Sequence, residues 1–94
     1  MKVKIVYYPP FDSLVGLRSE EVGVVGSSIT VLELLRKLAA DHPQVKPYVV
    51  TDSDEELRAQ ICVVAGSNLL RTVDKLEEGK VSEVKILPPI SGGS

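Results

Sequence analysis

The chain has 94 residues, of which 44% are hydrophobic and 26% are charged, and its formal net charge is −2. This length predicts one small domain, and the composition is ordinary for a globular protein. The small negative charge gives no electrostatic reason to expect binding to nucleic acid or to a membrane surface. One cysteine, Cys62, and one histidine, His42, exclude an internal disulfide and a zinc site.

The first eleven residues, MKVKIVYYPPF, do not have the pattern of a signal peptide. Lysines alternate with apolar residues until Pro9 and Pro10, so there is no continuous apolar region. No other stretch is long enough to span a bilayer. We therefore expect a cytoplasmic protein in a reducing environment.

Two strands are predicted near the start of the chain. Residues 2–8 alternate, with Val3, Ile5 and Tyr7 on one side and Lys2, Lys4, Val6 and Tyr8 on the other. A period of two with β-branched and aromatic residues is typical of a strand. Residues 19–25 predict a second strand, which Gly23 weakens.

The clearest helix is predicted over residues 30–43. Thr30 and Glu33 have the spacing of a capping box, in which each side chain bonds a free backbone N–H. An apolar stripe at helical spacing follows, made of Val31, Leu34, Leu35 and Leu38. Pro43 disfavours helical geometry at the preceding residue and ends the helix.

The second half of the chain predicts further strands. No clear pattern is present in residues 44–59. A buried strand is predicted over residues 60–66, and a short partner strand over residues 68–73. Residues 73–80 predict a turn. Residues 82–87 alternate again, with Val84 and Ile86 opposite Glu83, Lys85 and Leu87. The order β-β-α-β-β-β favours an α+β fold, in which a mixed sheet packs with one face on the helix.

No group of residues predicts a catalytic or metal site. His42 lies at a helix end, where an interaction with the helix dipole is the simplest role. Cys62 lies in an apolar run and is typical of a core or sheet residue. Phosphate-binding glycine motifs are absent. We therefore expect no catalytic residue of its own, no metal and no enzyme activity.

The last residues, ILPPISGGS, are the strongest functional signal. Pro88 and Pro89 favour a stiff, extended segment, and Ile90 is an apolar side chain suited to docking in a pocket. Gly92 and Gly93 have no side chains, so the tail can thread a narrow channel and present a carboxylate to another protein. A frayed, inactive end is the competing interpretation.

Three segments of the chain resemble a known family. KVKIVYYPPFDSLVG at the start, TVLELLRKLAADHP in the helix and KILPPISGG at the end are similar to the MoaD/ThiS family of ubiquitin-like sulfur carriers. The small subunit of molybdopterin synthase is the most similar member. The resemblance implies a β-grasp domain over residues 1–87, with first and last strands side by side, and an extended Gly-Gly tail over residues 88–94.

The resemblance also implies a function in molybdopterin (molybdenum cofactor) biosynthesis. A partner adenylyltransferase, similar to ubiquitin-activating enzymes, uses ATP to adenylate the carboxylate of Gly93. Sulfur replaces the adenylate and forms a thiocarboxylate. The large subunit of molybdopterin synthase then accepts the tail, and sulfur passes to a pterin precursor. In this family the carrier binds no cofactor itself.

Other functions are compatible with the same residues. The sulfur could instead be used to make thiamine, thiolated tRNA, cysteine or a tungsten cofactor. The chain could instead be a protein modifier joined to lysines of its targets through Gly93. An interaction module with an inactive tail is a third alternative.

The alternation of the first and last strands predicts a surface that binds a partner protein. Tyr8 and Leu87 are predicted on the sheet face away from the helix, with Leu69 beside them, as a partner-binding surface.

Ser94 follows Gly93 and blocks its carboxyl group. Three explanations are open for the presence of Ser94: a peptidase removes it, it is an extra residue foreign to the working chain, or the protein has lost the activity. We favour removal, because the Pro-Pro-Ile-x-Gly-Gly pattern is intact.

Overall fold

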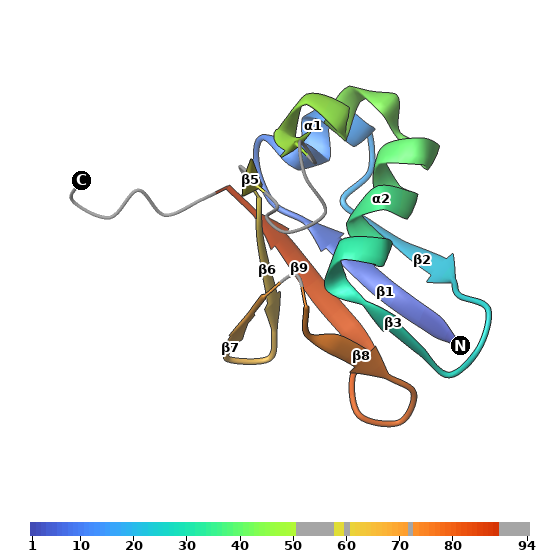
Figure 1. Ribbon diagram of the computed structural model, residues 1–94. Helices are drawn as coiled ribbons and strands as arrows, with labels where there is room; N and C mark the ends of the chain where they lie inside the picture. The colour runs from blue at the N-terminus through green and yellow to red at the C-terminus, as the bar shows by residue number, and fades with distance from the viewer. Residues whose placement is uncertain (51–57, 60, 72, 89–94) are drawn as a thin grey trace.

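A five-stranded sheet forms the centre of the protein. The computed structural model describes residues 1–50, 58–59, 61–71 and 73–88. The strands of the sheet follow the order β2-β1-β9-β6-β7 (Figure 1). They are β1 (Lys2–Tyr7), β2 (Ser19–Gly23), β6 (Cys62–Ala65), β7 (Asn68–Leu70) and β9 (Glu83–Leu87).

The first and last strands of the chain are neighbours in this sheet. β1 and β9 run parallel, with Ile5 beside Val84 and Tyr7 beside Ile86. The other pairs of the sheet are antiparallel. The predicted mixed sheet is therefore confirmed, and β9 lies in the middle of it.

The main helix, α2 (Val31–Asp41), covers one face of the sheet. The predicted capping box is present: the Glu33 N–H donates to Oγ1 of Thr30 at 3.1 Å, and the Thr30 N–H donates to Oε1 of Glu33 at 3.0 Å. The backbone hydrogen bond from Thr30 lowers the pKa of the Glu33 carboxyl. The helix ends at His42, because Pro43 follows.

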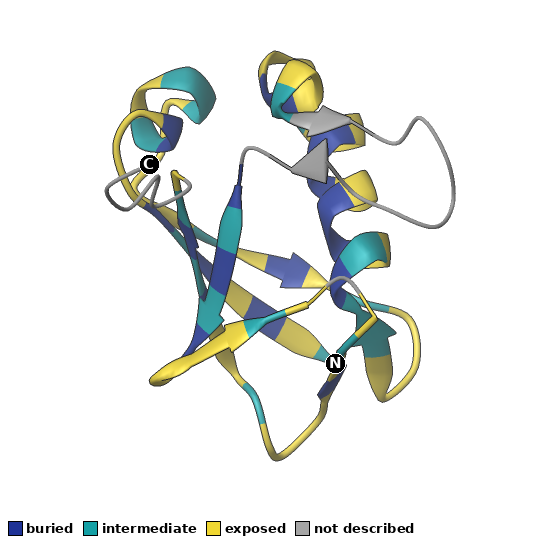
Figure 2. Cartoon of the chain, turned by 60° about the vertical axis from the view of Figure 1, so that its left-hand side comes forward, coloured by how far each residue is buried: buried dark blue, intermediate teal, exposed yellow. Residues whose placement is uncertain are grey.

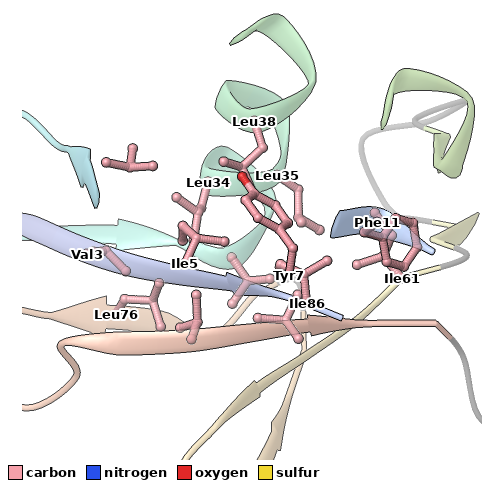
Figure 3. Packing of buried hydrophobic residues seen from close by; sticks show 14 of the residues in the cluster. Val3, Ile5, Tyr7, Phe11, Leu34, Leu35, Leu38, Ile61, Leu76 and Ile86 are labelled. Carbon is pink, nitrogen blue, oxygen red and sulfur yellow. The ribbon is translucent and has the colours of Figure 1, made fainter. Parts of the chain in front are cut away.

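The hydrophobic core fills the space between the sheet and α2. Figure 3 shows Val3, Ile5 and Tyr7 of β1 pointing toward Leu34, Leu35 and Leu38 of α2. All six are buried, as are Val84 and Ile86 of β9, so the predicted inward face is confirmed. Buried positions alternate with exposed ones along β1, and a buried stripe runs along α2 (Figure 2).

Several short elements were not predicted from the sequence. They are α1 (Phe11–Val15), β3 (Ser28–Thr30), the 3-10 helix η1 (Pro43–Tyr48), β4 (Val49–Val50), β5 (Arg58–Ala59) and β8 (Lys75–Glu77). None is long enough to show a hydrophobic period. The predicted turn over residues 73–80 is wrong in its middle, where β8 pairs with β3 and buries Leu76 completely.

His42 lies at the end of α2, as predicted, and makes a contact that was not predicted. Its N–H donates to the Leu38 carbonyl, and its ring contacts β2. Nε2 of His42 is 2.6 Å from Oε2 of Glu20, which also accepts the Tyr7 hydroxyl hydrogen bond at 2.5 Å. Through Glu20, the His42 side chain thus connects the end of the helix to β1 and β2, and its interaction with the helix dipole stays a prediction.

In the part of the chain that the structure describes, none of the helices has the length and apolar character needed to cross a membrane.

Candidate partner-binding site

The sheet face away from α2 carries an apolar surface near the end of β9. The Tyr8 N–H donates to the Ile86 carbonyl at 2.9 Å, which continues the β1–β9 pairing by one residue. Tyr8 therefore lies beside Leu87, and Leu87 lies opposite Cys62 of β6. These three residues form a row across three strands on the outer face.

A second row lies next to the first. Val6 is paired with Lys85, Lys85 with Val64, and Val64 with Leu69 of β7. Cross-strand neighbours on one face are about 5 Å apart, so these side chains are in reach of one another. The two rows together give what we call the outer apolar face: Val6, Tyr8, Cys62, Val64, Leu69 and Leu87.

The outer apolar face is open to solvent. Leu69 is 67% exposed and Tyr8 is 37% exposed, and the other members are partly exposed. Exposed apolar side chains gathered on one face are typical of a protein-binding surface. The structure thus places all three residues that the sequence singled out on one face: Tyr8 and Leu87 are neighbours, and Leu69 lies on β7, with β6 between it and Leu87. Their role in binding stays a prediction.

Three members of this face were not predicted as part of a binding surface. The alternation of residues 2–8 predicts Val6 on the outer side of its strand, but it does not by itself indicate binding. In the structure Cys62 and Val64 alternate with the buried Val63 and Ala65, but residues 61–65 are all apolar, so their hydrophobic pattern did not distinguish the outer face of β6 from the inner one. Leu17 belongs near the face as well. It is 42% exposed, and the β1–β2 register, continued past Ser19, places it beside Tyr8.

One charged side chain lies inside the outer apolar face and an ion pair lies beside it. Lys85 is in the second row, between Val6 and Val64, and is partly buried there. Nζ of Lys4 is 4.0 Å from Oε1 of Glu83 on the neighbouring strand. No ion pair of Lys85 occurs among the described residues, so a partner carboxylate could approach it.

The tail leaves from the same end of the sheet. Leu87 ends β9, and Pro88 is exposed directly after it. Pro89, Ile90, Gly92, Gly93 and Ser94 lie outside the described residues, so the threading role of the tail and the acyl-donor role of Gly93 stay predictions. The root of the tail is fixed in the central part of the sheet and lies next to the outer apolar face.

Few side chains suited to catalysis lie near one another in the described part of the chain. Within the described ranges, no three His, Cys, Asp or Glu side chains come close enough to hold a metal ion. An open cleft of about 480 Å³ lies between the β6–β7 hairpin and the segment before β9, and Asn68, Lys80 and Lys85 line it. The outer apolar face with the tail root is the feature best suited to function.

No family model matches the sequence, and no curated protein does either. Solved structures are similar. SAMP1 from Haloferax volcanii, described as small archaeal modifier protein 1, is 26% identical; the match covers 99% of this chain and 100% of that chain, with a TM-score of 0.75.

Two further structures share the fold. A putative molybdopterin converting factor, subunit 1, from Pyrococcus furiosus is 23% identical, with 96% and 99% of the two chains covered and a TM-score of 0.76. A chain of the BexX/CysO complex from Amycolatopsis orientalis is 24% identical, with 97% and 99% covered and a TM-score of 0.66. These neighbours confirm the resemblance to sulfur carriers of the MoaD/ThiS type, and the chain is a ubiquitin-like α+β protein with the β-grasp fold.

Proposed function

We propose that this protein is a sulfur carrier in which hydrolysis of the Gly93–Ser94 peptide bond frees the carboxylate of Gly93, which is then adenylated and converted to a thiocarboxylate. One observation carries the proposal: a Pro-Pro-Ile-x-Gly-Gly sequence follows directly on the central strand β9, at the end where the outer apolar face lies. The similarity to ubiquitin-like carriers and modifiers supports it.

The chemistry needs only the chain end and a docking surface from this protein. The Gly93 carboxylate attacks the α-phosphate of ATP on a partner adenylyltransferase, and pyrophosphate leaves. A sulfur nucleophile then attacks the acyl carbon, and AMP leaves. In this proposal the partner enzymes supply the catalytic side chains.

We further propose that the sulfur goes to molybdopterin. The likeness to the molybdopterin converting factor supports the fold needed for this role, and the sequence resemblance points to the same pathway. In this proposal the large subunit of molybdopterin synthase binds the outer apolar face and accepts the tail. Leu87 is the best candidate for an anchor, because it lies in the first row and directly before Pro88.

Ser94 provides the sharpest test. If Gly93 is the acyl donor, adenylation of Ser94 would place the activated carbon one residue further, roughly 3.5 Å along an extended chain. Catalytic geometry is sensitive to misplacements of about 1 Å. We therefore expect the 94-residue form to be inert with the adenylyltransferase, ATP and a sulfur donor, and the form ending at Gly93 to gain one sulfur in place of one oxygen.

Intact-mass spectrometry on both forms measures this outcome. Equal thiocarboxylate formation with Ser94 still attached would contradict the role of Gly93. The matched control is the 93-residue form without ATP, which should keep its original mass.

A second candidate function is protein modification through Gly93. The similarity to a small archaeal modifier protein favours it. A modifier uses the same activated glycine but forms an amide bond with a lysine of a target. Conjugates that survive a denaturing gel would indicate a modifier, whereas the exchange of oxygen for sulfur at the chain end would indicate a carrier.

A further inference from the structure

The strand β2 forms one edge of the main sheet. It pairs with β1 along one side, and no described strand pairs with its other side. The edge lies on the right of Figure 1, away from the tail root at the end of β9. An edge strand presents backbone N–H and C=O groups to which another strand can bind.

The hydrogen bonds around β2 show which backbone groups are free. The Tyr7 N–H donates to the Arg18 carbonyl at 2.8 Å, and the Val24 N–H donates to the Met1 carbonyl at 2.7 Å. Both pairs continue the β1–β2 register, and hydrogen-bonded pairs alternate along an antiparallel ladder. The pairs at Glu20 and Val22 therefore face β1.

The backbone groups of the intervening residues point away from β1. These residues are Ser19, Glu21 and Gly23, and all three are exposed. The other side of β1 supports the same alternation, because the Lys4 N–H donates to the carbonyl of Ser82, directly before β9, and the Tyr8 N–H donates to that of Ile86 in β9. Gly23 carries no side chain, and apart from its own chain neighbours no heavy atom lies within 4 Å of the position that a Cβ would occupy, so no side chain covers the face of the sheet at this end of β2.

The charge at this edge selects the kind of chain that can bind. Glu21 lies in register with Lys4, but the Lys4 ammonium is directed to Glu83, and no ion pair of Glu21 occurs among the described residues. A second copy of β2 would bring acidic side chains together, which is unfavourable in cross-strand pairs. A lysine or arginine opposite Glu21 would be favourable.

We propose that the free edge of β2 binds an extended, basic segment of a partner protein as an additional antiparallel strand. The segment carries Lys or Arg on the outer side, opposite Glu21, and apolar residues on the side of α2. The strand β1 shows this pattern already, since Lys2 and Lys4 alternate with Val3 and Ile5 in its pairing with β2. This site is separate from Gly93 and does not depend on the sulfur-carrier function.

A peptide with the sequence of residues 2–6, acetyl-Lys-Val-Lys-Ile-Val-amide, is the probe for this proposal. We expect its titration into the ¹⁵N-labelled 94-residue protein to shift the amide signals of Ser19, Glu21 and Gly23 most. Hydrogen exchange at these three amides should slow, because new hydrogen bonds protect them. A peptide with Glu in place of both Lys residues is the matched control and should bind more weakly, most clearly at low salt.

Two variants separate the charge from the backbone contacts. Glu21→Gln should weaken peptide binding about two- to fivefold at low salt, which is the range for one exposed ion pair. Glu21→Pro removes an N–H that points to solvent, so the fold should survive and binding should be lost. No shift at the highest soluble peptide concentration, shifts centred on β7 or the outer apolar face, or dimerisation through β2 would each overturn the proposal.

Discussion

Leu87 lies directly opposite Cys62 across the antiparallel pair of β9 and β6, on the face of the sheet that α2 does not cover. Tyr8 flanks Leu87 on the other side, where β1 continues the pairing with β9. The last residue of the central strand is therefore surrounded by apolar neighbours and is followed at once by the tail. Binding of a partner at this face would place the partner beside the root of the tail.

The change Leu87→Asp should weaken binding of the large subunit of molybdopterin synthase and leave the fold intact. A truncated anchor in an interface commonly costs about 2 kcal/mol or more, which is about thirtyfold in Kd. Titration calorimetry measures the affinity, and thermal unfolding checks the fold. Val25→Asp is the control, because Val25 is 100% exposed in the loop after β2 and should tolerate the charge. Equal Kd values for both variants would contradict the assignment of this face.

The change Gly93→Val, in a chain that ends at residue 93, should fold normally and resist adenylation. A β-branched side chain adds bulk and restricts the backbone at the residue that must enter a narrow active site. Pyrophosphate exchange with the adenylyltransferase measures this step directly, and the unchanged 93-residue chain is the reference. Exchange at the reference rate would show that the tail does not thread a narrow channel.

The change Tyr7→Phe should reduce the free energy of unfolding and alter its dependence on pH. Burial first, and then the hydrogen bond to Glu20 and the nearby negative charge, raise the pKa of the Tyr7 hydroxyl well above its ordinary value. Loss of this hydrogen bond to a carboxylate should cost about 1–3 kcal/mol at pH 7.

The sign of the pH effect follows from the direction of this shift. The folded state holds the Tyr7 proton more tightly than the unfolded state, so its contribution is complete below the ordinary tyrosine pKa of about 10 and declines as the pH rises above it. Urea unfolding between about pH 9 and pH 11 should show a steeper decline for the unchanged protein than for Tyr7→Phe. Tyr8→Phe is the matched control, since it removes an exposed hydroxyl and should keep the steep decline. The same slope in Tyr7→Phe as in the unchanged protein would show that the ionisation of Tyr7 does not cause the decline in the free energy of unfolding.

The change Leu76→Ala should destabilise the fold by about 2–5 kcal/mol, which is the usual range for a buried leucine. Leu76 is 0% exposed and lies in β8, opposite Ile29 of β3. Val73→Ala, at a side chain that is 65% exposed, should change the free energy of unfolding by less than about 0.5 kcal/mol. Urea unfolding measures both. A small effect at Leu76 would mean that the β3–β8 pair contributes little to the core.

Long periodic segments were predicted well, because each has apolar side chains along one side of its whole length and that side packs against a single neighbouring layer. The alternation of Val3, Ile5 and Tyr7 and the stripe of Leu34, Leu35 and Leu38 each indicated a buried face, and the structure packs these two faces against each other. The candidate site was predicted in part for the same reason. The period of β1 and β9 placed Tyr8 and Leu87 on the outer side.

The local sequence determined the long strands, the capped helix, the inward and outward faces and the chemistry of the tail. The local pattern could not determine which strands are neighbours, because the β1–β9 pairing joins residues about eighty positions apart; only the family resemblance predicted that the first and last strands lie side by side, which the structure confirms. Only the tertiary structure brought Cys62 and Val64 to the outer apolar face, turned His42 toward Glu20 and left one edge of β2 free. The physical reason is that hydrophobic period is a property of one segment, whereas register and sheet order are decided by the packing of the whole core.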